Sequence, residues 1–372
     1  MSNTQKKNVP ELRFPGFEGE WEEKKLESII KVNSGKNYKH LDKGDIPVYG
    51  TGGYMTSVSE PLSEIDAVGI GRKGTINKPY LLEAPFWTVD TLFYCTPKKE
   101  TDILFILSLF RKINWKVYDE STGVPSLSKQ TINKINRFVP TNKEQQKIGK
   151  FFSKLDRQIE LEEQKLELLQ QQKKGYMQKI FSQELRFKDE NGNDYPNWTN
   201  ERLGEVTTVT MGQSPKSVNY TDNSNDTVLI QGNADIENGL INPRIYTREV
   251  TKLIQKDEII LTVRAPVGKL AMAQINACIG RGVCSIKGDK FLYYFLEWFA
   301  TQNKWIRFSQ GSTFESISGN DIRNIHIKIP VEDERTKIIK LLNSLDVLNS
   351  KTDLKIQNLK QRKKSLLQKL FI

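Results

Sequence analysis

The segment Gly69-Ile70-Gly71-Arg72-Lys73-Gly74 has the G-x-G-x-x-G spacing with which many proteins hold the pyrophosphate of a dinucleotide. This chemistry requires a strand before the glycines and a helix after them, so that the phosphate meets the helix N-terminus. Residues 65–68 can form the strand, but residues 75–80 contain β-branched side chains and a proline, which disfavour a helix. We therefore predict a glycine-rich turn between strands, and the role of Arg72 and Lys73 must be sought in the rest of the chain.

The other sequence patterns that carry catalysis are also missing. There is no P-loop Lys-Ser/Thr pair after a glycine loop, no Asn/Asp-Pro-Pro-aromatic motif of an amino-methyltransferase and no Pro-Asp pair of a nuclease. His40 and His326 are far apart, and Cys95, Cys278 and Cys284 are too scattered for a disulfide framework or a zinc site. We predict a non-catalytic chain with no metal site and no bound cofactor, whose cysteines are reduced and mostly buried.

The charge balance favours a polyanionic partner. Lys and Arg outnumber Asp and Glu by 56 to 45 among 372 residues, a formal net charge of +11. Such an excess is typical of proteins that bind nucleic acid, although charge that serves solubility alone is an equal alternative. The N-terminal residues are polar and no run of 18 apolar residues occurs, so we expect a cytoplasmic protein with no membrane partner.

An internal repeat organises the chain. Residues 140–182 align with residues 330–372 without a gap, and identical residues occupy many matching places. The segments ahead of them correspond more loosely, through Leu12-Arg13-Phe14 and Leu185-Arg186-Phe187, Trp21 and Trp198, Leu26 and Leu203, Gly35 and Gly212, and Gly50 and Gly232. The remaining parts of the two halves differ, so the order is variable body, repeated segment, variable body, repeated segment.

Each variable body has the pattern of an α+β domain. One apolar helix is predicted in each body, over residues 103–114 and 291–306. The strands are predicted as β-branched or apolar runs bounded by Gly, Pro, Asn or Asp, at residues 46–49, 67–70, 87–95, 206–210, 228–231, 259–263, 270–275 and 325–329.

The repeated segments have the heptad pattern of long helices whose apolar seam packs on a partner helix. The predicted seam consists of Ile148, Phe152, Leu155, Ile159, Leu166, Leu169, Ile338, Leu342, Leu345, Ile356, Leu359 and Leu366. The first helix leads from body one to body two and the second leaves body two, so we predict that they pack antiparallel as a coiled-coil spacer. A compact single domain with two surface helices is the alternative, and it leaves most of the seam without a partner.

The predicted fold class is therefore α+β, with two globular domains separated by two long antiparallel helices and related by a pseudo-twofold internal repeat. The predicted parts are an N-terminal arm (residues 1–20), body one (21–140), the first long helix (141–184), body two with its leading linker (185–330) and the second long helix (331–372).

A basic chain with two different heads and no catalytic motif is typical of a protein that reads DNA at two places. Polar, cationic and aromatic loop residues supply donors for phosphates and base edges, although a plain surface role is the alternative for each of them. In this interpretation Arg72 and Arg264 occupy about the same place, each on a turn that presents a cation to DNA. The candidates are Lys36, Tyr38, Lys39, Thr51, Tyr54, Arg72, Lys73, Ser126 and Lys129 in body one, and Gln213, Ser214, Lys216, Gln231, Asn233, Arg264, Lys269, Arg281, Ser312, Thr313 and Asn320 in body two.

Over its whole length the chain resembles the specificity subunit of type I restriction–modification systems. The resemblance is carried by the helix ends KKGYMQKIF and KKSLLQKLF, by the segments VPTNKEQQKI and IPVEDERTKI before the helices, and by the W-x4-L-G/E-x-V/I openings ahead of each body. It implies that each body is a target recognition domain for one half of a bipartite, asymmetric DNA site. It also implies that the helices set the half-site spacing and dock two modification subunits, which methylate adenine with S-adenosylmethionine.

The same resemblance implies restriction subunits that use ATP and Mg²⁺ to cut double-stranded DNA, while the specificity subunit itself is non-catalytic. The alternatives are a stand-alone DNA-modifying enzyme, for which GIGRKG is the only candidate cofactor loop, and a coiled-coil scaffold without a role in DNA binding.

Overall fold

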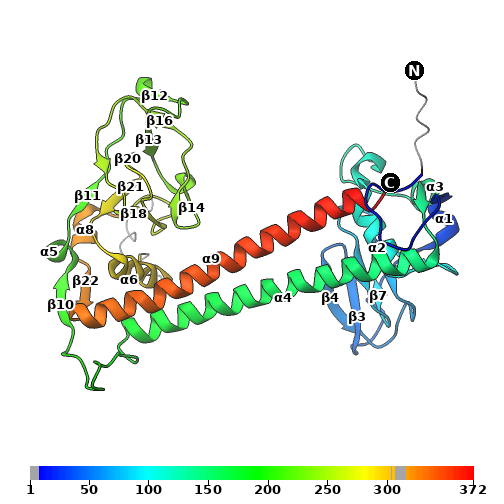
Figure 1. Ribbon diagram of the computed structural model, residues 1–372, viewed down its shortest axis with the longest axis horizontal. Helices are drawn as coiled ribbons and strands as arrows, with labels where there is room; N and C mark the ends of the chain where they lie inside the picture. Colours follow the sequence, from blue (N-terminus) through cyan, green and yellow to red (C-terminus); the bar gives the residue numbers. More distant parts are fainter. Residues whose placement is uncertain (1–7, 303, 306–315) are drawn as a thin grey trace. The chain divides into compact units, whose positions relative to one another are not determined.

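The computed structural model describes residues 8–302, 304–305 and 316–372 (Figure 1). The chain divides into two compact units, Met1–Lys165 with Thr352–Ile372, and Leu166–Lys351, which we call unit 1 and unit 2. Each unit contains a mixed α+β body and part of each of two long helices, α4 (Asn142–Phe181) and α9 (Glu332–Lys369). The α+β class and the two long helices predicted from the sequence are confirmed.

The body of unit 1 is built on a four-stranded antiparallel sheet with the order β2-β8-β5-β6. A three-stranded sheet, β4-β3-β7, contains one parallel pair, and β1 pairs with β9. The elements are β1 (Glu22–Lys25), α1 (Leu26–Ile29), β2 (Ile30–Ser34), β3 (Ile46–Gly50), β4 (Gly53–Val58), β5 (Ala67–Gly71), β6 (Tyr80–Leu82), β7 (Trp87–Thr88), β8 (Leu92–Pro97), α2 (Ile103–Lys112), η1 (Trp115–Tyr118), α3 (Lys129–Lys134) and β9 (Asn136–Val139).

The body of unit 2 has the same plan with a larger second sheet. Its four-stranded antiparallel sheet has the order β11-β21-β18-β19, its five-stranded sheet the order β12-β16-β13-β20-β17, and β10 pairs with β22. The elements are β10 (Thr199–Arg202), α5 (Leu203–Val206), β11 (Val209–Met211), η2 (Ser217–Asn219), β12 (Tyr220–Thr221), β13 (Thr227–Ile230), η3 (Asn233–Asp235), β14 (Ile236–Glu237), β15 (Leu240–Ile241), β16 (Tyr246–Thr247), β17 (Leu253–Ile254), β18 (Ile259–Thr262), β19 (Leu270–Met272), β20 (Ala277–Ile279), β21 (Val283–Ile286), α6 (Lys290–Thr301), α8 (Gly319–Arg323) and β22 (His326–Ile329).

The repeat therefore extends into the bodies, although their sequences differ. The parallel pair β3–β7 of unit 1 corresponds to β13–β20 of unit 2, with Tyr49 opposite Thr88 and Ile230 opposite Ile279. In this register the residue after Tyr49, Gly50, matches Gln231. The sequence-based match of Gly50 with Gly232 is wrong by one residue, because both glycines follow short apolar runs that do not reveal the strand register.

Side-chain caps fix where the body helices begin. The Asp102 carboxylate accepts the amide of Phe105 at the start of α2, and Asp289 accepts the amide of Leu292 at the start of α6. Helix α4 passes closely over the first of these caps. A Cβ added at Gly149 would lie 2.5 Å from Oδ1 of Asp102, so glycine allows this helix crossing.

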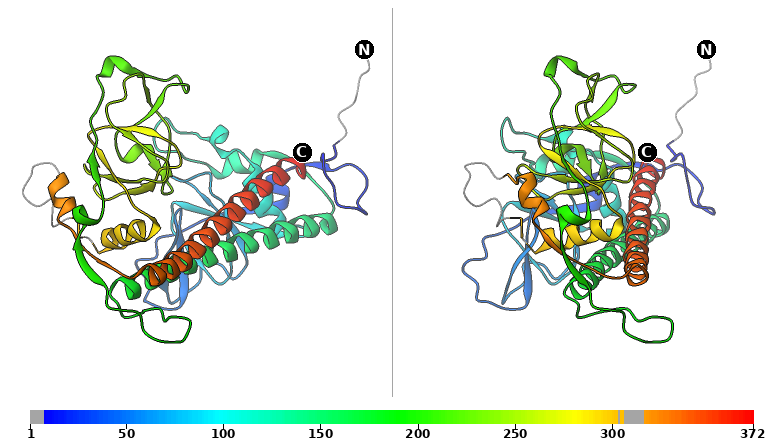
Figure 2. Two further views of the ribbon diagram at one scale, coloured as in Figure 1. Left: turned by 60° about the vertical axis from the view of Figure 1, so that its left-hand side comes forward. Right: turned by 90° about the vertical axis from the view of Figure 1, so that its left-hand side faces the viewer.

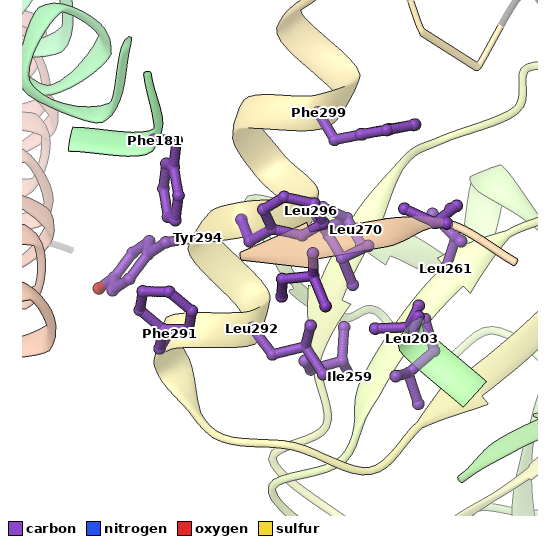
Figure 3. Close-up of a cluster of buried hydrophobic side chains, with 14 of the residues drawn as sticks. Phe181, Leu203, Ile259, Leu261, Leu270, Phe291, Leu292, Tyr294, Leu296 and Phe299 are labelled. Atoms are coloured by element: carbon purple, nitrogen blue, oxygen red, sulfur yellow. The ribbon is translucent and has the colours of Figure 1, made fainter. Parts of the chain in front are cut away.

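Aromatic residues from the repeat join each body to its long helices. In unit 1, Phe371 lies 5.5 Å from the ring of Phe105 and 6.2 Å from that of Trp21. In unit 2 its repeat counterpart, Phe181, packs on Phe291 of α6, and Figure 3 shows these side chains in one buried cluster. Both views of Figure 2 show α6 between the strands of unit 2 and the end of α4. The identical phenylalanines thus perform the same packing role twice.

The two long helices run antiparallel within each unit (Figure 1). In unit 1, Glu162 of α4 pairs with Lys355 of α9, and Asp156 of α4 pairs with Lys363 of α9. The residue number falls along α4 as it rises along α9, so the helices run in opposite directions. In unit 2, Lys173 of α4 lies 2.7 Å from a carboxylate oxygen of Asp346 on α9. Of the predicted seam residues, Ile148, Phe152, Leu155, Ile159, Ile338, Leu342, Leu345 and Ile356 are buried, and Leu166, Leu169, Leu359 and Leu366 are half-buried.

The N-terminal arm hydrogen-bonds the last turn of α9 in the same way that the residues following α4 hydrogen-bond the last turn of α4. The amide of Leu185 donates to the carbonyl of Lys179, 3.0 Å away, just after α4 ends. The amide of Leu12 donates to the carbonyl of Lys369, 2.9 Å away, at the end of α9. The arm therefore supplies to the second repeat the contact that the following residues supply to the first.

Some local predictions are wrong. Residues 87–95 do not form one strand, because β7 and β8 belong to different sheets and are separated by a turn at residues 89–91. Val206 ends the short helix α5, and the strand predicted there begins at Val209. Short helices α1, α3, α5 and α8 also accompany the single long helix predicted in each body.

Candidate nucleic-acid interface

The glycine segment at residues 69–74 forms the end of β5 and a tight turn that leads to strand β6. A Cβ at Gly71 would lie 2.2 Å from the carbonyl oxygen of Thr75, and Gly74 has φ +86. The turn therefore needs glycine for close backbone approach and for a left-handed conformation. Because no helix follows the glycines, the segment lacks the geometry of a dinucleotide-binding loop.

In unit 1 several predicted DNA-binding segments meet at the turn of residues 89–91. The amide of Lys36 donates to the carbonyl of Thr88 at 2.8 Å, and the amides of Arg72 and Lys73 donate to that of Thr91 at 2.8 and 3.3 Å. Lys36, Arg72 and Lys73 are all exposed. Backbone hydrogen bonds thus bring three cations from two distant segments to one turn.

Ser126 and Lys129 join the same cluster. Lys73 forms a β-bridge with Ser126, and the amide of Leu127 donates to the carbonyl of Arg72 at 2.9 Å. Ser128 caps helix α3, of which Lys129 is the first residue. The Asp119 carboxylate accepts the amides of Ser126 and Ser121, and these hydrogen bonds lower its pKa, so it stays ionised while it holds this loop.

The other candidates of unit 1 lie on neighbouring loops. Thr51 lies at the β3–β4 turn and Tyr54, which is 64% exposed, at the start of β4. The amide of Val89 donates to the carbonyl of Tyr49, which ties this hairpin to the same turn. Tyr38 is half-buried against the small apolar cluster beneath, whereas Lys39 is exposed.

In unit 2 the corresponding turn is Gly280-Arg281-Gly282. The amide of Gln213 donates to the carbonyl of Ile279 at 2.9 Å, as the amide of Lys36 donates to that of Thr88 in unit 1. The amide of Val263 donates to the carbonyl of Gly282 at 2.9 Å, as the amide of Arg72 donates to that of Thr91. In addition, the amide of Arg281 donates to the hydroxyl of Ser214 at 3.0 Å. The two turns therefore occupy the same place in two matching frames.

A small pocket lies beside this turn and collects five of the candidates in unit 2. Its volume is about 230 Å³. It is lined by Ser214, Gln231, Gly232, Asn233, Arg264, Ala265, Arg281 and Gly282. The nearby Asp235 carboxylate is buried and accepts the amides of Gln231 and Gly232, at 2.8 and 3.1 Å, so it shapes the pocket wall from behind.

The match between Arg72 and Arg264 is displaced by one residue. Arg264 forms a β-bridge with Ser316, as Lys73 does with Ser126, so Lys73 is its counterpart. Val263 takes the place of Arg72, since the amides of both residues bond the carbonyl at the end of the turn. A cation at this position of the frame is still common to both units.

The remaining candidates of unit 2 do not line the pocket or lie outside the described residues. The Lys269 ammonium donates to the carbonyls of Asn233 and Ile236, so it supports the backbone. The amide of Lys216 donates to Glu249, and the side-chain oxygen of Asn320 accepts from Arg323. Ser312 and Thr313 lie outside the described residues.

Sequence reasoning missed Asp90 at the centre of the unit 1 turn and Asp235 behind the unit 2 pocket. Asp90 lies inside a run that reads as one strand, so its turn became visible only through the sheet order. The signal that was present is the sequence Val89-Asp90-Thr91, where an acidic residue interrupts an apolar strand pattern.

The described residues hold neither a metal site nor a membrane-spanning helix. Within residues 8–302, 304–305 and 316–372, no cluster of His, Cys, Asp and Glu has the arrangement of a metal site. In the same residues, no helix combines the length and the apolar character needed to cross a bilayer. Cys95, Cys278 and Cys284 are free and buried, and burial raises the pKa of Cys284 to about 12.

The two units thus repeat one frame with different side chains at the corresponding turn, and each unit builds this frame onto segments of the same two long helices. The family model described as type I restriction modification DNA specificity domain matches residues 18–171 and again residues 195–361. The chain therefore belongs to the family of type I restriction–modification specificity subunits, as the sequence resemblance predicted.

Two relatives from Methanocaldococcus jannaschii are similar in sequence. A protein named for the specificity subunit of the type I restriction enzyme MjaX is 30% identical over 261 residues, which cover 66% of this chain and 61% of that protein. The alignment thus spans less than two thirds of this relative. The specificity subunit of the type I restriction enzyme MjaVIII is 25% identical over 312 residues, or 77% of this chain and 71% of that protein.

Solved structures share the fold. The S subunit of a type I restriction–modification system from M. genitalium matches with a TM-score of 0.69 at 16% identity, over 98% of this chain and 99% of that chain. A second structure, from work on complex assembly and conformational transition of the type I R-M system, matches with a TM-score of 0.59 at 18% identity, over 96% of this chain and 98% of that chain.

Proposed function

We propose that this chain is the DNA-reading subunit of a type I restriction–modification complex, with unit 1 and unit 2 each reading one half of a bipartite, asymmetric site. The observation that carries the proposal is that two matching frames present different side chains at the same turn, with Asp90 in one and Arg281 in the other. A shared frame gives both heads the same way of approaching DNA, and different side chains give them different half-sites.

The long helices set the spacing between the half-sites in this proposal, because α4 and α9 each continue from one unit into the other. Two modification subunits dock on the chain and methylate adenine with S-adenosylmethionine. Restriction subunits supply the ATP- and Mg²⁺-dependent cleavage, and this chain contributes recognition without catalysis.

Binding of duplex DNA by the full-length chain with its modification subunits tests the proposal. Arg72→Ala or Arg264→Ala should weaken binding and reduce the slope of log K against log salt by about one, because each removes one cation from the loops that meet DNA in this proposal. Arg157→Ala, which removes an exposed cation from the middle of α4, is the matched control and should leave both quantities unchanged. Unchanged affinity across the salt series for both loop variants would contradict the assignment of these loops.

A further inference from the structure

The centres of the two corresponding turns carry opposite charges. Asp90 follows Val89, whose amide donates to the carbonyl of Tyr49, and Arg281 follows Gly280, whose amide donates to the carbonyl of Ile230. The residue after each turn then closes it: the amide of Leu92 donates to the carbonyl of Val89 at 3.0 Å, and that of Val283 to Gly280 at 3.2 Å. The central residues therefore occupy equivalent positions, and both are exposed.

The residues beside the central one hold the turn, which leaves the central side chain to face outward. A Cβ at Gly282 would lie 1.9 Å from the carbonyl oxygen of Gln231, and one at Gly280 would lie 3.0 Å from the hydroxyl of Ser214. Both flanking positions thus pack against the rest of unit 2. In unit 1, Val89 is 9% exposed and belongs to a buried cluster. In unit 2 the turn therefore presents its central side chain, whereas in unit 1 the half-buried Thr91 lies beside the exposed Asp90.

The chemistry around Arg281 fits the edge of a base. The adjoining pocket, at about 230 Å³, is smaller than the roughly 300–1,000 Å³ of a typical small-molecule site, so it suits one edge of a polymer. None of the described residues that line it is acidic, and Arg264, Gln231 and Asn233 bring further donors. Arginine binds the O6 and N7 acceptors of guanine through two parallel hydrogen bonds.

Asp90 has the complementary chemistry. An ionised carboxylate only accepts hydrogen bonds and is repelled by phosphate, so it adds nothing to backbone contacts. Lys36, Arg72 and Lys73 bond this turn through their backbone amides, and the Arg72 guanidinium donates to the backbone carbonyl of Asp90 at 3.5 Å. Among the described residues, no ion pair involves the Asp90 carboxylate itself. Carboxylates on DNA-facing surfaces accept from the N4 amino group of cytosine.

We propose that this single turn position selects one base in each half-site, guanine through Arg281 in unit 2 and cytosine through Asp90 in unit 1. The inference rests on the proposed function and adds the base and the residue that reads it. The cations beside Asp90 hold the phosphates, while the carboxylate accepts from the base.

Selection from a random duplex library at fixed salt tests this proposal, using the full-length chain with its modification subunits. Arg281→Gln should lower the preference for guanine at one position of one half-site by about 10- to 100-fold and leave the other positions unchanged. Arg281→Lys keeps the charge but lacks the paired donors, so it should lose the same preference while the salt slope stays the same. Arg248→Gln removes an arginine that lies outside the pocket and should change nothing.

Asp90→Asn should abolish the preference for cytosine at one position of the other half-site, and Asp45→Asn, an exposed acidic residue on another loop, is its control. A uniform loss of affinity at all positions for Arg281→Gln, rescued by Arg281→Lys, identifies a phosphate contact and overturns the inference while the proposed function stands. An unchanged site for Asp90→Asn also overturns it. Failure of the unmodified protein to select any site contradicts the proposed function itself.

Discussion

Lys173 and Asp346 form an ion pair between α4 and α9 in unit 2, and the same pair recurs in unit 1 as Lys363 and Asp156. All four residues belong to the sequence repeat, so the repeat encodes one ion pair twice. In unit 2 the Lys173 ammonium is also 2.8 Å from the carboxylate of Glu297 on α6. This lysine thus connects both long helices to the body.

Lys173→Ala should destabilise unit 2, because it removes the cation that two carboxylates share. Lys173 is 8% exposed, but the side chains of Glu297 and Asp346 are 33% and 36% exposed. Solvent therefore reduces the free-energy cost of leaving these two carboxylates without the lysine. We expect the free energy of unfolding to fall by about 2–3 kcal/mol. Urea denaturation measures the effect, and Lys174→Ala, at the exposed neighbouring position, should stay within about 0.5 kcal/mol of the unmodified protein. Equal values for the two variants would contradict the shared-cation role.

The same cluster gives unit 2 a pH dependence. Burial raises the pKa of Glu297 above its ordinary value of 4.5, so the folded state holds this proton more tightly than the unfolded state does. The free energy of unfolding should therefore decrease as the pH rises from 4.5 through the raised pKa. Glu297→Gln should flatten this part of the stability curve, as measured by denaturation in a series of buffers. A curve of unchanged slope would show that Glu297 ionises normally.

Glu144 and Glu334 occupy the same position of the repeat, and both carboxylates are buried, but their hydrogen-bond partners differ. Glu334, fully buried, accepts from Arg186 at 2.6 and 3.1 Å and from the indole of Trp198 at 2.9 Å. Glu144 accepts from Arg13 at 2.9 and 2.7 Å. Among the described residues, the indole nitrogen of Trp21 has no hydrogen-bond partner.

Replacing either carboxylate should destabilise its own unit by about 2–4 kcal/mol, because a half-buried arginine, 17% or 21% exposed, loses its counter-ion. We expect Glu334→Ala to cost about 1 kcal/mol more than Glu144→Ala, because it also leaves the Trp198 indole without an acceptor. Urea denaturation followed by tryptophan fluorescence compares the two variants. A larger loss for Glu144→Ala would contradict this ranking.

The proposed spacer role of the helices predicts the effect of a paired insertion. Seven residues added after Lys165 in α4 and seven before Thr352 in α9 restore the heptad phase on both helices. They lengthen each helix by about 10 Å, which equals about three base pairs of duplex. The preferred gap between half-sites should grow by that amount in a selection from random duplexes. Insertion into one helix alone should lower stability, and an unchanged gap after the paired insertion would contradict the spacer role.

The sequence was most informative where its pattern is long. The heptads and the repeated Glu144/Glu334 and Lys173/Lys363 positions identify the two helices, because a 3.6-residue period sustained over many turns has few alternative explanations. The family followed from the same segments. The glycine turn at residues 69–74 was also predictable, since the residues after it disfavour a helix.

The candidate site was less predictable, because strand register depends on partners far away in the chain. Asp90 remained hidden in an apolar run, and Arg264 was matched to Arg72 instead of Lys73. Both errors arise from pairs of two- to six-residue strands, whose register is set by the sheet and not by local composition. The individual DNA contacts remain predictions.

The tight packing of Gly280 and Gly282 around Arg281 has a consequence for how such proteins diversify. Gly280 and Gly282 must stay glycine for the turn to pack, whereas the exposed position 281 can change its side chain without disturbing the fold. In the proposed function, a new base preference can therefore arise through substitutions at a few turn centres, while the caps and the helix ion pairs are inherited unchanged.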